Sequence, residues 1–210
     1  MNILDQPDNF GKSDIPNKKI FDLPDADITL FENFFTKQES DILFNDLSEK
    51  ILWQQDHIKI YGKQIDLPRL TAWYGDTNKS YSYSGIAMNP HPWTDDLLLI
   101  KNRLEKEVAV SFSSVLLNQY RHGQDSVGWH SDAEKELGQN PVIGSVSFGE
   151  TRSFQLKHLI RKDLTKVEIP LTHGSFLLMK GSTQHFWKHQ IPKTSRNIKP
   201  RINLTFRVIV

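Results

Sequence analysis

Cysteine is absent from this chain of 210 residues, and so is any long uninterrupted run of apolar residues. Without thiols the protein cannot form disulfides, zinc–thiolate sites or iron–sulfur clusters, and it has no cysteine nucleophile. No apolar run approaches the length needed to cross a bilayer, and residues 1–14 are polar and acidic, unlike a signal peptide. A cysteine-free chain suits a reducing compartment. We therefore expect no membrane association and a location in the cytoplasm, or in the nucleus if the source is eukaryotic.

Acidic residues are scarce near the end of the chain. Residues 151–210 contain 12 Lys and Arg but only 2 Asp and Glu, whereas residues 1–150 contain 14 and 23, so the net charge of +1 hides a strong asymmetry. A one-sided basic surface is typical of proteins that bind a polyanion such as nucleic acid. The alternative is a solvated basic face that balances an acidic one, and charge alone does not decide between them.

The periodicity of apolar residues predicts an α+β protein that is mainly β. Apolar residues recur at helical spacing in 38–52 and 92–108, and Pro92 and Thr94 are typical of a helix start. After residue 111 the pattern changes to short apolar or alternating runs separated by turns, at 115–120, 128–132, 142–148, 153–158, 167–171, 175–179, 186–190 and 202–210. This order predicts a double-stranded β-helix, or jelly roll, with both N-terminal helices packed on one sheet.

The length fits a single domain, which we place at residues 27–210 with the jelly-roll core at about 111–210. Residues 1–26 are polar and contain three prolines, so we expect an N-terminal arm that is poorly ordered. The chain is expected to be a monomer.

The most informative motif is His130-Ser131-Asp132. Residues two apart on a strand point to the same side, and two imidazoles with one carboxylate can hold Fe(II) on one face while leaving positions open for O2 and a cosubstrate. The third ligand must come from another strand. His189, in an aromatic-led strand that ends at proline, is favoured over His185. Taken alone, His130 and Asp132 could equally form a hydrogen-bonded pair without metal.

A second polar pattern predicts a clamp for a diacid. Arg201, Asn203, Thr205 and Arg207 alternate with apolar residues, so they share one face of a strand. Arginine's planar fork suits a carboxylate, and Asn118 and Tyr120 alternate likewise just before the metal motif. Iron ligands together with a diacid clamp indicate a 2-oxoglutarate-dependent oxygenase. The alternative for the arginine strand is the exposed edge of an amphipathic strand.

These motifs, in this order, resemble the AlkB family of Fe(II)/2-oxoglutarate dioxygenases, which repair alkylated nucleic acids. The resemblance runs from about Trp53 to Val210 and is carried by 118–120, 130–132, 145–149, 173–175, 187–189 and the R-x-N-x-T-x-R strand at 201–207. It is closest to the branch of the human DNA-repair homologues. It implies a cosubstrate, 2-oxoglutarate, held by the clamp, and demethylation of bases such as 1-methyladenine and 3-methylcytosine in DNA or RNA, with release of formaldehyde and succinate.

The resemblance also implies a nucleotide-recognition lid at about 53–85. Within it, Tyr61, Gly62 and Lys63 look like a hairpin whose aromatic tip fills the gap left by a flipped base. Trp73, Tyr74 and Gly75 would contact or stack on the damaged base, as expected when an enzyme extrudes its target. Packing over a sheet is the plainer role for Trp53 and Trp73.

The sequence departs from the family after the metal aspartate. Related enzymes usually carry another acidic residue there, whereas this chain has Ala133, with Glu134 as the next carboxylate. Either Glu134 contacts the damaged base, or base selectivity differs. Two other functions stay open: an oxygenase acting on a substrate other than nucleic acid, and a nucleic-acid-binding jelly roll with a degenerate metal site.

Overall fold

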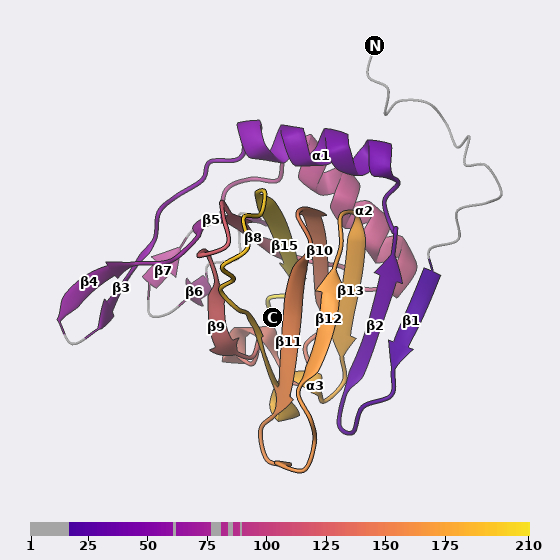
Figure 1. The fold of residues 1–210 in the computed structure, drawn as a ribbon. Helices are drawn as coiled ribbons and strands as arrows, with labels where there is room; N and C mark the ends of the chain where they lie inside the picture. Colours follow the sequence, from indigo (N-terminus) through magenta and orange to yellow (C-terminus); the bar gives the residue numbers. More distant parts are fainter. Residues whose placement is uncertain (1–16, 61, 77–80, 84–85, 89) are drawn as a thin grey trace.

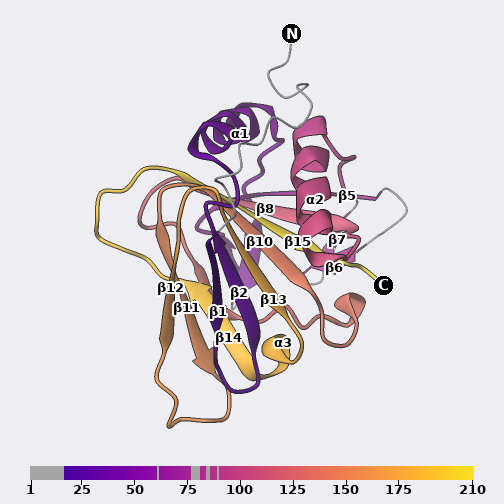
Figure 2. The ribbon, with the colours of Figure 1, turned by 90° about the vertical axis from the view of Figure 1, so that its right-hand side faces the viewer.

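Two antiparallel β-sheets face each other, and two helices cover the outer side of the larger sheet (Figures 1 and 2). The computed structural model describes residues 17–60, 62–76, 81–83, 86–88 and 90–210. The large sheet has the order β1 (Asn17–Phe21), β2 (Asp27–Glu32), β13 (Ser175–Lys180), β10 (Ile143–Gly149), β15 (Arg201–Arg207), β8 (Ser114–Tyr120) and β5 (Leu70–Gly75). The small sheet has the order β12 (Val167–Leu171), β11 (Arg152–His158), β14 (Trp187–Ile191) and β9 (Val127–His130).

The remaining described elements are two hairpins, two long helices, one short helix and a 3-10 turn. One hairpin consists of β3 (His57–Ile60) and β4 (Lys63–Asp66) and extends away from the sheets, and the other of β6 (Tyr81–Tyr83) and β7 (Ile86–Met88) (Figure 1). The helices are α1 (Lys37–Lys50), α2 (Asp95–Val108) and α3 (Thr183–Phe186), with a 3-10 turn at Lys135–Leu137. Among the described residues, no helix is long and apolar enough to span a membrane.

Local capping fixes where the two long helices begin. The Thr36 hydroxyl accepts from the Glu39 backbone amide, and the Glu39 carboxylate accepts in return from the Thr36 amide, which forms a capping box at α1. The Thr94 hydroxyl caps α2 by accepting from the Leu97 amide, as its position in the sequence predicts. α2 ends at Ala109, which adopts a left-handed conformation.

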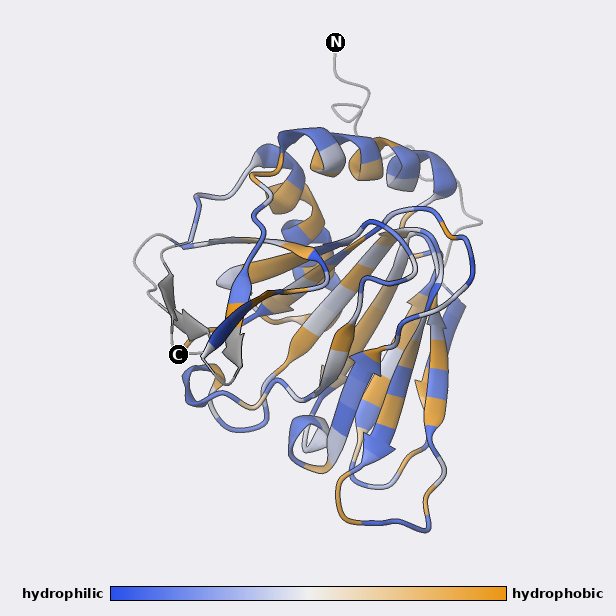
Figure 3. Cartoon of the chain, turned by 60° about the vertical axis from the view of Figure 1, so that its left-hand side comes forward, coloured by the Kyte–Doolittle hydropathy of each residue, from blue (hydrophilic) through white to orange (hydrophobic). Residues whose placement is uncertain are grey.

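Alternation along the strands divides the interior into two cores. Phe31 faces the core beneath the helices, whereas its neighbours Ile28 and Leu30 face the core between the two sheets. Figure 3 shows orange and blue bands along several strands, where apolar and polar residues alternate. Because large-sheet strands contribute to both cores, polar residues on their inner face can line a cavity between the sheets.

The predicted jelly roll with two helices on one sheet is confirmed, but its boundaries need correction. Residues 17–21, predicted to belong to a poorly ordered arm, form β1 and pair with β2 at the edge of the large sheet. Residues 1–16 lie outside the described part of the chain. The core does not start at residue 111, because β1, β2 and β5 extend the large sheet, and β5 was predicted to belong to the lid. α3 was not predicted.

Candidate metal and cosubstrate site

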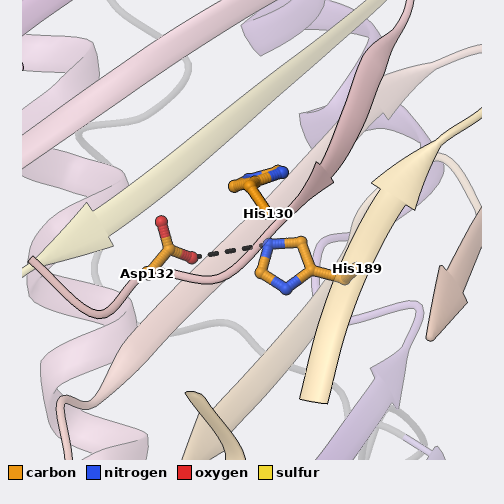
Figure 4. A group of neighbouring side chains, drawn as sticks. All are labelled: His130, Asp132 and His189. Atoms are coloured by element: carbon orange, nitrogen blue, oxygen red, sulfur yellow. Dashed lines mark ion pairs between the residues drawn. The ribbon is translucent and has the colours of Figure 1, made fainter. Parts of the chain in front are cut away.

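The three predicted metal ligands meet at one end of the small sheet. His130 ends β9, Asp132 follows it, and His189 lies in β14 directly opposite His130 in the strand register. One ligand atom from each lies within 4.8 Å of the others, and Figure 4 shows the three side chains converging. His185 lies apart from them and contacts Asn140. The preference for His189 is therefore confirmed, and the donor set of two nitrogens and one oxygen suits Fe(II).

Neighbouring groups orient the two imidazoles. His130 Nδ1 lies 2.8 Å from the Gly128 carbonyl, an acceptor, so this nitrogen carries the proton and Nε2 is left with its lone pair. The His189 ring stacks on Phe154, with ring centroids 5.0 Å apart. Both rings are therefore held for metal binding in the way that surrounding contacts usually fix histidine ligands.

Two hydrogen bonds hold Asp132 in place. Arg207 Nη2 donates to the carboxylate Oδ1 at 2.5 Å, and the backbone amide of Asp132 donates to Gln184 Oε1 at 2.9 Å. Burial alone would raise the pKa of Asp132, but the charge of Arg207 and the nearby imidazoles lower it to about 2. The carboxylate is therefore ionised at neutral pH, as a metal ligand must be.

Burial has the opposite consequence for His189. It disfavours the charged imidazole and, together with His130, lowers the pKa of His189 to about 3 although Asp132 opposes the shift. The ring is therefore neutral at physiological pH and keeps the lone pair that a metal requires.

This pKa predicts how the stability of the metal-free protein depends on pH. In the unfolded chain His189 takes up a proton below about 6.5, whereas the folded chain resists protonation down to about 3. The free energy of unfolding should therefore fall as the pH drops, by up to about 2 kcal/mol between pH 6.5 and about 5. Asp132 titrates at lower pH, so it does not contribute in this range. Denaturant unfolding across this range measures the change.

The matched control is His185, an exposed histidine whose ring contacts the neutral amide of Asn140. His189→Asn should flatten the dependence of the free energy of unfolding on pH, and His185→Asn should leave it unchanged. An unaltered slope in the His189→Asn protein would assign the effect to other groups.

The polar face of β15 lines a cavity between the two sheets. Arg201, Asn203, Thr205 and Arg207 all border it, and the three metal-ligand candidates border it too, with Val127 beside them. All four are buried or partly buried. This arrangement excludes the alternative that the arginine strand is an exposed edge, because β15 lies between β10 and β8.

Arg201 is the strongest sign of an anionic ligand. It is only 1% exposed, Nη2 donates to Ser147 Oγ at 2.9 Å, and the guanidinium lies 5.1 Å from the centre of the Tyr120 ring. Within the described residues, Nε and Nη1 have no hydrogen-bond partner. Burial lowers the pKa of Arg201 to about 10, which still leaves it charged. A buried cation with unpaired donors fits the carboxylate of a cosubstrate.

The other predicted clamp residues differ in whether their polar groups are already hydrogen-bonded to the protein. Asn118 and Tyr120 lie on β8 and border the cavity, beside Arg201 and Asn203 on β15. The Asn203 amide is engaged by the protein itself, because Nδ2 donates to Ser145 Oγ and the Val146 carbonyl while Oδ1 accepts from Thr205. Asn203 and Thr205 therefore form a bracing pair within the cavity wall.

Three further residues belong to this network and were not predicted from the sequence. Arg69 is buried at the cavity and donates through Nε to Asn118 Oδ1 at 2.7 Å, so it fixes which end of that amide faces the cavity. Ser145 and Ser147 support the β15 side chains. Polar residues at alternate positions of an otherwise apolar strand could have pointed to the serines, whereas nothing local distinguishes Arg69 from a surface arginine.

The predicted base contacts are separated by the two faces of β5. Trp73 packs in the core between the sheets, on the side of the cavity. Tyr74 packs in the other core, is 3% exposed, and accepts a hydrogen bond from the Leu52 amide through its hydroxyl. The prediction that Tyr74 stacks on a base is therefore wrong, because neighbouring residues of a strand face opposite sides. At Gly75 a Cβ would lie 2.7 Å from the Ser113 carbonyl oxygen, which indicates packing against β8.

The remaining predicted substrate contacts that the structure describes do not border the cavity. Gly62, with φ of +79°, and Lys63 are exposed where β3 turns into β4. Tyr61 lies outside the described residues. Glu134 is partly buried and does not border the cavity, but its Oε2 is buried without a hydrogen-bond partner in the described part of the chain.

Residues 27–207 match the 2OG-Fe(II) oxygenase superfamily. The chain belongs to that family. Two proteins called alpha-ketoglutarate-dependent dioxygenase alkB homolog 3 are similar to this oxygenase, at 41% identity in Bos taurus and 40% in Homo sapiens. Each similarity covers 190 residues, 87% of this chain and 66% of the relative. The DNA oxidative demethylase ALKBH2 of Mus musculus is 35% identical over 84% of this chain and 77% of its own length.

The oxygenase thus spans just under two thirds of the length of the alkB homolog 3 proteins. Its similarity to both groups places it with the AlkB homologues, as the motifs predicted. "The structure of OsALKBH1" matches 90% of this chain and 100% of that one, with a TM-score of 0.64 at 15% identity, which shows a shared fold.

Proposed function

We propose that this oxygenase uses Fe(II), 2-oxoglutarate and O2 to remove methyl groups from alkylated bases of DNA or RNA, with release of formaldehyde and succinate. The observation that supports the proposal is that two groups border the same cavity. One is the cluster of His130, Asp132 and His189, and the other is the buried Arg201 with its unpaired donors. A metal and a dicarboxylic keto acid fit these two ends of the cavity. The name of the ALKBH2 relative, DNA oxidative demethylase, supports alkylated nucleic acid as the substrate class.

Each protein group has a separate task in this proposal. His130, Asp132 and His189 hold the metal, and Arg207 keeps the Asp132 carboxylate ionised and directed at it. Arg201 and Tyr120 bind the far carboxylate of 2-oxoglutarate, while Arg69 directs the Asn118 amide toward the same molecule. Iron, keto acid and oxygen together supply the oxidation of a methyl C–H bond. The protein contributes position and an interior shielded from water.

Nucleic acid as the substrate is supported by charge and by aromatic placement. The last sixty residues carry a large excess of Lys and Arg, and Lys63 is exposed on a hairpin that extends from the sheets (Figure 1). Trp73 lies on the cavity side of β5 and is the remaining candidate for contact with a flipped base. We infer that the lesion is cationic, such as 1-methyladenine or 3-methylcytosine. Glu134, the first carboxylate after Ala133 in the sequence, is the candidate to contact this lesion. We further propose a monomer that acts in the cytoplasm, or in the nucleus of a eukaryote.

A product assay tests this function. The protein is supplied with Fe(II), 2-oxoglutarate and oxygen together with single- or double-stranded DNA or RNA that carries 1-methyladenine or 3-methylcytosine. We expect formaldehyde and the unmodified base in equal amounts, and neither from an unmethylated strand. Succinate formation without any base repair would contradict the nucleic-acid assignment and favour an oxygenase with another kind of substrate.

A further inference from the structure

Arg152 is a second buried arginine near the end of the cavity where Arg201 lies. It begins β11 in the small sheet, is only 3% exposed, and its guanidinium lies 5.5 Å from the centre of the Tyr120 ring. Arg201 reaches the same ring from the large sheet, at 5.1 Å. Tyr120 is therefore held against two guanidinium groups that come from opposite sheets.

The hydrogen bonds of Arg152 join the two loops that flank the metal-bearing strands. Nη2 donates to the Asp125 carbonyl at 2.9 Å, just before β9, and to the Pro192 carbonyl at 2.6 Å, just after β14. Nη1 is buried and has no hydrogen-bond partner in the described part of the chain. The nearby Asp125 carboxylate is engaged by Arg121.

Positive charge accumulates at this end of the cavity with only partial compensation by the protein. Among the described residues neither Arg152 nor Arg201 forms an ion pair, and three of their nitrogens are buried without hydrogen-bond partners. Burial lowers the pKa of both groups, and the charge of Arg152 adds to the lowering at Arg201, while Tyr120 and Asp125 partly oppose the shift at Arg152. Two buried cations without ion-pair partners destabilise a fold unless an anion offsets them.

We propose that Arg152 is a positioning residue that, through Tyr120 and its own charge, makes the cavity selective for a keto acid with a second carboxylate. Arg152 does not border the cavity and need not touch the ligand. It holds the phenol of Tyr120 in place beside Arg201, and its charge adds to the field that the distal carboxylate meets. The inference rests on the proposed cosubstrate site.

The test compares two ligands by calorimetry on the full chain loaded with Mn(II): 2-oxoglutarate, and 2-oxopentanoate, which lacks the distal carboxylate. Arg152→Gln should weaken the binding of 2-oxoglutarate by about 10- to 100-fold and leave the affinity for 2-oxopentanoate nearly unchanged. The affinity of Arg152→Lys, which keeps the charge, for 2-oxoglutarate should lie between those of the wild type and Arg152→Gln. Lys157→Gln, an exposed cation on the same strand, should alter neither affinity.

The outcomes separate the inference from the function on which it rests. If Arg152→Gln weakens both ligands equally, or neither, Arg152 only holds the fold and the proposal is overturned. It is overturned as well if Arg152→Lys behaves like Arg152→Gln toward 2-oxoglutarate. If the wild type itself does not prefer 2-oxoglutarate to 2-oxopentanoate, the proposed cosubstrate site is wrong, whatever Arg152 does.

Discussion

Replacing Asp132 with asparagine is expected to abolish turnover and to lower the free energy of unfolding by about 3–5 kcal/mol. Turnover is lost because the only anionic metal ligand of the cluster becomes neutral. Stability is lost because Arg207, 7% exposed and bonded to Asp132 Oδ1, becomes a buried cation without this counter-ion. Denaturant unfolding and succinate production measure the two effects.

The double variant Asp132→Asn with Arg207→Met separates these effects. Removing both charges should restore much of the stability, since a buried pair is often replaceable by apolar groups, while turnover stays absent. If the double variant is as unstable as Asp132→Asn alone, the loss of stability has another cause than the broken ion pair between Asp132 and Arg207. Arg207→Met alone should also weaken metal binding, because burial would then raise the pKa of Asp132.

Replacing Arg201 with methionine is expected to weaken cosubstrate binding without lowering the stability of the protein. The KM for 2-oxoglutarate should rise by at least about 30-fold, because truncating one partner of a buried charge pair typically costs about 2–5 kcal/mol. The metal-free protein should not be destabilised, since the change removes a buried cation that the protein does not neutralise. Kinetics at varied cosubstrate concentration and thermal unfolding test the two statements.

Arg161→Met is the matched control for Arg201. Arg161 is exposed and pairs with Asp163 outside the cavity, so its loss should leave the KM for 2-oxoglutarate unchanged. A marked loss of stability in Arg201→Met would mean that the guanidinium stabilises the packing of the strands and is not a destabilising cation that binds an anionic ligand. An unchanged KM would contradict the proposed binding of the far carboxylate.

Patterns with a fixed period predicted most of the fold and the centre of the site. Alternation located most of the strands, the helical spacing located α1 and α2, and residues two apart in β15 were correctly placed on one face. His130 and Asp132 do converge, but β9 ends at His130 and Asp132 lies just after it, so the predicted strand 128–132 is too long. These inferences succeeded because strand geometry alone determines which side a residue faces relative to its neighbours.

Contacts between distant segments could not be predicted in this way. Alternation states that Trp73 and Tyr74 face opposite sides, but not which side meets the cavity, and Tyr74 was therefore misassigned. The pairings of Arg69 with Asn118 and of Arg152 with two loop carbonyls depend on how the sheets pack, which no local pattern encodes. The strand β1 was missed because its sequence is mostly polar and exposed, and its stability comes from pairing with β2.

Exposure differs across the site: His130 is partly solvent-accessible, whereas Arg201 is 1% exposed. Under the proposed function, a diacid bound at Arg201 lies deeper than the metal ligand His130, and a nucleic-acid strand resting against His130 would cover the diacid. The proposed function therefore predicts an order of binding in which the diacid binds before the strand and the spent acid leaves after it.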